Sequence, residues 1–132
     1  IKQTTKVGDV SFVITIDAND PAKMIEFWSS VLRYELDTPD QFNDPKQVYW
    51  YLVDPANKGM RLLIQRVPEP VTAKSRIHID VHVDDIETEA NRAIKMGAKR
   101  VDATPMTEFG ATWIRMIDPE GNHFCFVLNQ EK

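Results

Sequence analysis

The segment 76–85 alternates between apolar and polar side chains. Aliphatic residues occupy positions 77, 79, 81 and 83, and His78, Asp80 and His82 stand between them. Successive side chains of a strand point to opposite faces, so the pattern predicts a strand with one face packed on an apolar layer and the other carrying ionisable groups. Asp84 or Asp85 is then expected to cap a helix.

The other periodicities predict a strand, a helix and three further strands in each half of the chain. In the first half, strand 10–17 precedes a helix that begins at Asp20-Pro21 and carries apolar residues at 24, 27, 28, 31 and 32. Strands are predicted next at 34–36, 47–53 and 60–67. In the second half, strand 76–85 precedes a helix that ends at Gly97 and carries Ile86, Ala90, Ala93 and Ile94 on one face. Strands are predicted there at 100–101, 112–117 and 123–128.

Three pairs of markers recur at a spacing of 64 residues, which indicates an internal duplication. The pairs are Asp20-Pro21 with Asp84-Asp85, Leu32-Arg33 with Met96-Gly97, and Asp54-Pro55 with Asp118-Pro119. The first strands match at a spacing of 65. We therefore predict an α+β protein made of two paired βαβββ modules, about 9–67 and 76–129, within a single domain over 1–132. The modules are expected to form a curved mixed sheet around a cleft, with the helices outside.

Composition narrows the class of protein. A chain of 132 residues with 42% hydrophobic and 27% charged residues is ordinary for a soluble domain, and no apolar run reaches the roughly 18 residues of a membrane span. The net charge of −4 argues against a nucleic-acid partner. A single cysteine, Cys125, cannot form an internal disulfide, which agrees with a reducing compartment. We expect a cytoplasmic protein with neither membrane nor nucleic acid as a partner.

Several motifs taken together carry a family resemblance. They are Asp20-Pro21 leading to Phe27-Trp28 and 32–36, then 65–70, 76–80 and 118–125. In these motifs, which cover nearly the whole chain, the sequence resembles the vicinal oxygen chelate superfamily (glyoxalase I, bleomycin-resistance proteins and extradiol dioxygenases), especially its small bacterial glyoxalase-like branch. The resemblance implies paired βαβββ modules, a homodimer, and a ligand or metal in the cleft. Arg33 departs from the family pattern, which has glycine at the end of this helix.

The resemblance also implies where a divalent ion would bind. Family members use one position on the first and one on the last strand of each module, normally filled by His, Gln or Glu. The corresponding residues here are Val13, Leu63, His78 and Cys125, of which only His78 and, at best, Cys125 offer ligand atoms. Gln65 and His123 lie two residues from these positions, about 6–7 Å along a strand. We expect no metal or other cofactor.

Candidate site residues come from the polar faces of the predicted strands. His78 and Asp80 are candidate catalytic residues because they share a strand face and imidazole is the commonest general acid or base. A histidine satisfied within the core is the alternative for His78, and a small buried apolar side chain is the alternative for Cys125. Candidate ligand-binding residues are Gln65, Tyr49, Tyr51, Trp113, Arg115, His123 and Cys125. His82 is expected to be solvated.

Three functions are consistent with these residues. The first is binding of a small aromatic or amphipathic molecule in a cleft lined by aromatic residues, without metal. The second is a metal-dependent lyase or dioxygenase, and the third is a structural dimer with no ligand. The lack of metal-ligating side chains favours the first function over the second. The polar groups gathered in one cleft favour it over the third, because burying them without a partner costs free energy. The substrate, and whether the protein is an enzyme, are left open.

Overall fold

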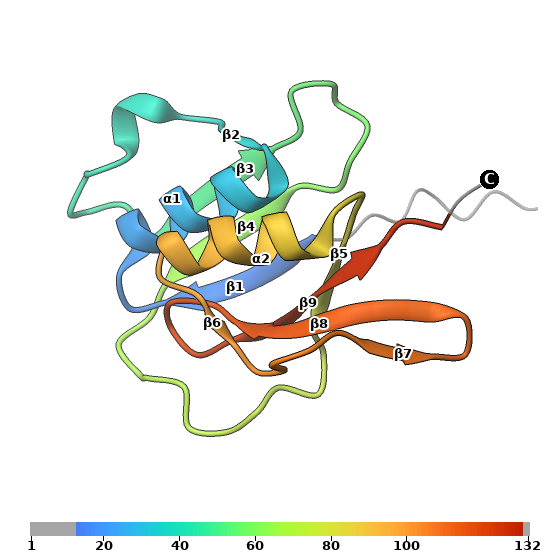
Figure 1. The fold of residues 1–132 in the computed structure, drawn as a ribbon. Coiled ribbons are helices and arrows are strands. Elements are labelled where there is room, and N and C mark those ends of the chain that lie inside the picture. Colours follow the sequence, from blue (N-terminus) through green and yellow to red (C-terminus); the bar gives the residue numbers. More distant parts are fainter. Residues whose placement is uncertain (1–12, 131–132) are drawn as a thin grey trace, which may run out of the picture.

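A computed structural model of the chain describes residues 13–130, which form two sheets with one α-helix in each module (Figure 1). Module one contains β1 (Ile14–Ala18), α1 (Pro21–Leu32), β2 (Glu35–Leu36), the 3₁₀ helix η1 (Pro39–Gln41), β3 (Tyr49–Val53) and β4 (Leu62–Arg66). Module two contains β5 (Ile79–Val83), α2 (Ile86–Lys95), β6 (Lys99–Arg100), β7 (Met106–Glu108), β8 (Ala111–Ile117) and β9 (His123–Leu128). Residues 10–12 of the predicted first strand lie outside the described residues.

The strand order confirms the α+β class and the paired βαβββ modules. Sheet one has the order β1-β4-β3-β2, and sheet two has the order β5-β9-β8-β6 with β7 added to β8. In both sheets the first strand of the module runs parallel to the last, and the other pairs are antiparallel. The first strand of each module, β1 or β5, therefore lies at an edge of its sheet. The helices α1 and α2 lie side by side across the sheets (Figure 1).

One apolar core joins the two modules. Phe27 and Trp28 of α1 pack edge to face on Phe124 of β9, with ring centroids 5.0 to 5.8 Å apart. The strand residues Trp50, Leu52, Ile114 and Met116 are buried in this core, so their face of each sheet is the one packed on the helices. The residues between them, including Tyr49, Tyr51, Trp113 and Arg115, lie on the opposite faces of their sheets.

The starts of the two helices show that the predicted spacing of 64 residues is wrong at the helix caps. Asp20 caps α1 by accepting a hydrogen bond from Lys23 N, and Asp85 caps α2 by accepting one from Thr88 N. The equivalent of Asp20 is therefore Asp85 and not Asp84, so the spacing at the caps is 65 residues, as in the first strands. A spacing of 64 returns at the helix ends, where Arg33 and Gly97 both have positive φ angles.

Two further expectations about elements were wrong, and one strand was missed. The apolar face of segment 76–85 does not include Ile77, which is 82% exposed and precedes β5. Ile94 is 42% exposed, because it lies about 80° around α2 from Ile86 whereas Ala90 and Ala93 lie within about 40° of it. The short strand β7 was not predicted at all.

Candidate functional site

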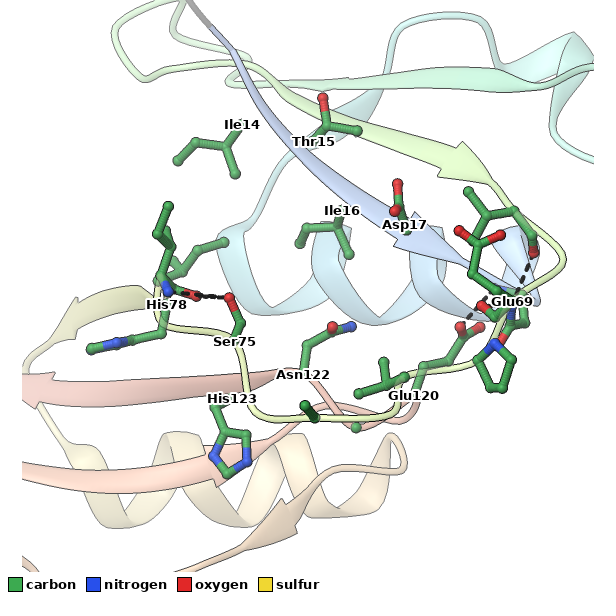
Figure 2. A pocket seen from close by; sticks show the side chains of 18 of the residues that line it. Ile14, Thr15, Ile16, Asp17, Glu69, Ser75, His78, Glu120, Asn122 and His123 are labelled. Carbon is green, nitrogen blue, oxygen red and sulfur yellow. Dashed lines mark hydrogen bonds between the residues drawn. The ribbon is translucent and has the colours of Figure 1, made fainter.

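A cavity of about 630 Å³ lies between the two modules (Figure 2). One wall is β1 with Trp28, and the opposite wall is the turn 120–122 with His123, the first residue of β9. The linker 67–77, which connects the modules, and the start of β5 complete the lining. Because β1 is the edge strand of its sheet, side chains from both of its faces contribute to the cavity.

The middle of the cavity is apolar and its ends are polar. Ile14 and Ile16 of β1 and Val71 of the linker are among the apolar lining residues. Figure 2 shows the acidic residues Asp17, Glu69 and Glu120 at one end and the imidazoles of His78 and His123 at the other. An apolar cavity with a few polar groups at defined places is the usual form of a small-molecule site.

Asn19 holds the linker against module one. Its side-chain Nδ2 donates to the carbonyl oxygens of Val67 and Glu69, both at 2.9 Å. Pro68 and Pro70 flank Glu69 and each fixes its own backbone φ at about −65°, in a segment that bends at residues 68 and 69. These contacts fix the linker as a wall of the cavity.

A second set of hydrogen bonds fixes the turn 118–122. Glu120 Oε1 and Oε2 accept from the backbone N–H groups of Asn19 and Asp20, at 2.6 and 2.7 Å, beside the start of α1. Asp118, which is buried, accepts from the Trp28 indole N–H at 3.2 Å and from the backbone N–H groups of Glu120 and Asn122. The turn of module two is thereby bonded directly to the first helix of module one.

Beyond the imidazole end, the outer face of sheet two carries a group of ionisable side chains. His78 Nε2 lies 3.1 Å from Asp80 Oδ1, and both side chains are about half exposed. Asp80 is paired in register with Cys125, which is paired with Arg115. Burial and then the charge of Asp80 raise the pKa of the Cys125 thiol to about 11, so the thiol is protonated at neutral pH. This protonation state does not suit a nucleophile.

Arg115 forms an ion pair with Asp102. Its Nη2 lies 2.7 Å from Asp102 Oδ1, and hydrogen bonds from the guanidinium lower the pKa of that carboxyl group. A second cavity, of only about 50 Å³, borders Arg115 together with Lys74, His78, His123, Phe124 and Cys125. It has room for no more than a few water molecules.

The structure divides the residues predicted for the site. Five of them, His78, Asp80, Arg115, His123 and Cys125, come together at one side of sheet two, and of these only His78 and His123 line the large cavity.

The four others lie outside the lining of either cavity. Tyr49 and Gln65 are paired across β3 and β4, Tyr51 lies on the same face of β3 under the guanidinium of Arg61, and Trp113 lies on β8. His82 is exposed, as expected.

Several cavity residues were not predicted, among them Asn19, Glu69, Glu120 and the apolar residues of the linker. Glu69 and Glu120 fall within the motifs 65–70 and 118–125 that carry the family resemblance, but nothing in these motifs marks either residue as lining a cavity.

The described residues include one group that could hold a metal ion, formed by His78, Asp80 and Cys125. Of the four family positions, Val13 and Leu63 have no ligand atoms. The other two, His78 and Cys125, have Asp80 beside them as a third possible ligand. The ligand atoms of these three lie within 4.8 Å of one another, whereas those of a tetrahedral zinc site lie less than about 4 Å apart. The His78 and Asp80 side chains already pair with each other.

The fold and the motifs agree with a comparison against family models. The model of the glyoxalase-like domain matches residues 13–127. The chain belongs to the glyoxalase-like family. It thereby falls within the glyoxalase/bleomycin resistance/dioxygenase superfamily that the sequence motifs resemble. No curated protein matches the chain.

Solved structures of the glyoxalase-like fold are similar to this chain over most of its length. An enzyme of the glyoxalase/bleomycin resistance protein/dioxygenase family from Burkholderia phytofirmans is 18% identical with a TM-score of 0.69, over 88% of this chain and 95% of that one. The fosfomycin resistance protein FosX from Mesorhizobium loti is 16% identical with a TM-score of 0.68, over 95% of this chain and 94% of that one. At these identities the similarity shows the fold. None of the helices in residues 13–130 has the length and apolarity needed to cross a membrane.

Proposed function

We propose that this protein binds a small aromatic or amphipathic molecule in the cavity between its two modules. The observation that carries the proposal is the cavity itself, whose volume of about 630 Å³ falls within the range of roughly 300–1,000 Å³ that small-molecule sites occupy. Its apolar middle suits the body of such a molecule, and its polar ends suit the groups that orient it. The hydrogen bonds of Asn19 and Glu120 hold the walls in place before any ligand binds, which lowers the entropic cost of binding.

A panel of planar and amphipathic compounds tests this function. Binding to the folded protein alone stabilises it by RT ln(1 + [L]/Kd), so the melting temperature rises with the logarithm of ligand concentration once that concentration exceeds Kd. Ala73 lies in the exposed linker and lines the cavity, so Ala73→Trp should fill the cavity and abolish the shift. Ala103→Trp, at an exposed position outside the lining, is the matched control and should leave the shift intact.

Trp113→Ala distinguishes this cavity from the outer face of sheet two. If the ligand binds in the cavity, this substitution on β8 leaves the shift in place. A shift that Trp113→Ala abolishes and Ala73→Trp preserves would place the ligand among the aromatic residues of the strands, as the sequence led us to expect, and not in the cavity.

The proposed binding needs no metal. Val13 and Leu63 offer no ligand atoms, and a tightly bound catalytic ion generally needs three protein ligands with one open position. A metal-dependent lyase or dioxygenase is the alternative, favoured by the proximity of His78, Asp80 and Cys125. Elemental analysis after dialysis against Zn, Ni, Mn and Fe is expected to find well under one equivalent. About one equivalent in the wild type, lost in His78→Ala, would establish the alternative.

We also propose that the functional unit is a homodimer. The edge strands β1 and β5 each leave one side without a partner strand among the described residues, and exposed sheet edges are commonly covered by a further chain.

A further inference from the structure

The large cavity runs along the free edge of β1. Residues 13–17 all line it, although their side chains alternate between the two faces of the strand. Figure 2 shows Ile14 and Ile16 pointing to one side of β1, and Thr15 and Asp17 pointing to the other. A cavity beside one face would be lined by every second residue, so this cavity extends around the edge that β4 does not cover.

The pairing with β4 shows which backbone groups of this edge are free. Val67 N donates to Ala18 O at 3.0 Å, so the N–H and C=O groups of Ala18 point toward β4. These groups alternate in direction from one residue to the next along a strand. The backbone groups of Ile16 therefore also point toward β4, whereas those of Thr15 and Asp17 point away from it.

A hydrogen bond on the cavity side agrees with these directions. Asn19, two residues after Asp17, donates its backbone N–H to Glu120 Oε1 at 2.6 Å. Within residues 13–130, no hydrogen bond reaches the outward N–H and C=O groups of Thr15 or Asp17. These groups are available to a ligand, and the contact between Asn19 and Glu120 closes the row at one end.

We propose that the cavity selects small molecules with two peptide-like amide groups, which extend sheet one by donating to Thr15 O and accepting from Asp17 N–H. This inference rests on the proposed small-molecule binding and adds the chemical class of the ligand. Pairing with the edge of a sheet is an established mode of peptide recognition. A ligand residue opposite Ile16 places its side chain on the same face as Ile16, where Trp28 also lines the cavity, so an apolar side chain is favoured.

The surroundings of this edge favour a small ligand over a strand of a second protein. The linker 67–77 and the turn 120–122 line the same cavity, so the edge faces other parts of the chain across a volume of about 630 Å³. Such a volume suits a small molecule, whereas a strand from another protein would bring its sheet with it. A second copy seated over the mouth of the cavity would enclose the edge without pairing with it.

Matched ligands test the pairing. The probe is N-acetyl-L-phenylalanine methylamide, and each of two analogues has one of its N–H groups replaced by an ester oxygen. Titration calorimetry should show that at least one analogue binds about three- to tenfold more weakly than the diamide, because the donor to Thr15 O is lost. A larger loss at the phenylalanine N–H indicates parallel pairing, and a larger loss at the methylamide N–H indicates antiparallel pairing.

Proline substitutions test the protein side of the pairing. Asp17→Pro removes the donor at Asp17 and should weaken binding of the diamide about three- to tenfold. Proline is accepted in an edge strand where its missing N–H would face away from the neighbouring strand. His82→Pro is the matched control. Asn129 N donates to Val83 O, so the His82 N–H points to the free edge of β5, outside the lining of both cavities. This variant should change the affinity less than twofold.

Hydrogen exchange in the wild type gives a readout that does not depend on the folding of a variant. Bound diamide should slow exchange of the Asp17 N–H at least about tenfold and leave exchange of the Ile16 N–H, which points toward β4, unchanged. Slow exchange at Asp17 without ligand, increasing with protein concentration, would show that a strand of a second copy covers the edge. That result would overturn the proposal.

Three other results would also overturn the amide pairing and leave small-molecule binding supported. They are equal affinities of the diamide and both esters, equal losses in the two proline variants, and unchanged exchange at Asp17 with the diamide bound. If the diamide does not bind at millimolar concentration but planar compounds raise the melting temperature and Ala73→Trp abolishes that shift, only the amide class is wrong. Absence of binding by all of these compounds would count against the proposed function as well.

Discussion

Arg33 has a backbone conformation that favours glycine. It ends α1 with φ 59° and ψ 40°, in the left-handed region where a Cβ atom is unfavourable, and its N–H donates to Ser29 O. Gly97, its counterpart after α2, has φ 104°. The family pattern of glycine at this position therefore reflects the geometry of the helix end. Arginine is tolerated here, and its guanidinium lies 2.8 Å from Glu89 of α2.

Two substitutions of Arg33 separate the effect of the left-handed backbone conformation from the effect of the ion pair with Glu89. Arg33→Ala loses the pair with Glu89 and keeps the unfavourable φ, whereas Arg33→Gly loses the pair and removes the strain. We expect Arg33→Gly to be more stable than Arg33→Ala by about 1 kcal/mol. Urea denaturation of both variants measures the difference. Equal stabilities would mean that the strain at this helix end is negligible.

Asp118 and Asp54 are equivalent residues in the two modules with unequal surroundings. Both accept backbone N–H groups in the turn that follows them, but only Asp118 is buried and bonds the indole of Trp28. Asp118→Ala should destabilise the protein by about 3 kcal/mol, because it leaves several buried donors without acceptors. Asp54→Ala should cost clearly less, since water reaches its donors. Thermal unfolding of the two variants makes the comparison, and an equal loss would contradict the role assigned to Trp28.

At the scale of elements, the hairpin between β7 and β8 has an unusual turn. Phe109 and Gly110 both have positive φ angles, 53° and 77°, as in a type I′ turn, whose first position favours asparagine, aspartate or glycine. The Phe109 side chain is 96% exposed, so it contributes no packing within the chain.

Phe109→Asn is accordingly expected to raise the free energy of unfolding by about 0.5–1 kcal/mol. Phe109→Ala is the matched control, because it removes the same exposed ring and keeps a residue that disfavours positive φ. Chemical denaturation should rank the asparagine variant above the alanine variant. The opposite order would show that the turn differs from type I′ in solution.

The elements that the sequence predicted well are those set by local signals. The bounds of β9 were predicted as observed, and Asp20 with Pro21 marked the start of α1. Ile77 fits the alternation of apolar and polar residues that marks β5, but it lies outside the strand. Ile79 pairs with Phe124, so Ile77 would lie level with Asn122, which is bonded to Asp118 in the turn. Periodicity along one strand contains no information on where its partner begins.

At the scale of the molecule, the site was less predictable than the fold. Strand parity correctly separated the core face from the outer face, because burial follows the period of two. The cavity lies instead between the modules, and its walls include a linker and a turn with no periodicity. The hydrogen bonds that place them, such as Asn19 to Val67 and Glu120 to Asp20, join residues 48 and 100 positions apart. Only the folded chain brings such residues together.

The cavity mouth carries exposed apolar side chains that predict assembly into a dimer. Ile14, Val71 and Ile77 line the cavity and are 37%, 47% and 82% exposed, an apolar surface that lies beside the free edge of β1. A second copy seated on the outer side of these residues would remove apolar surface from water at about 25 cal/mol per Å², and it would close the mouth of the cavity over a bound ligand. Sedimentation at micromolar concentration is expected to give twice the chain mass of 15.2 kDa.

Ile77→Asp should weaken this dimer at least about tenfold, because it places a charge where apolar surface is buried. Ile94→Asp is the matched control, since Ile94 is 42% exposed on α2 and does not line the cavity. A wild type that sediments as a 15.2 kDa species at all concentrations would contradict the dimer. A dimer that Ile94→Asp disrupts and Ile77→Asp does not would place the interface on the helices, and the cavity mouth would then be open to ligands in both copies.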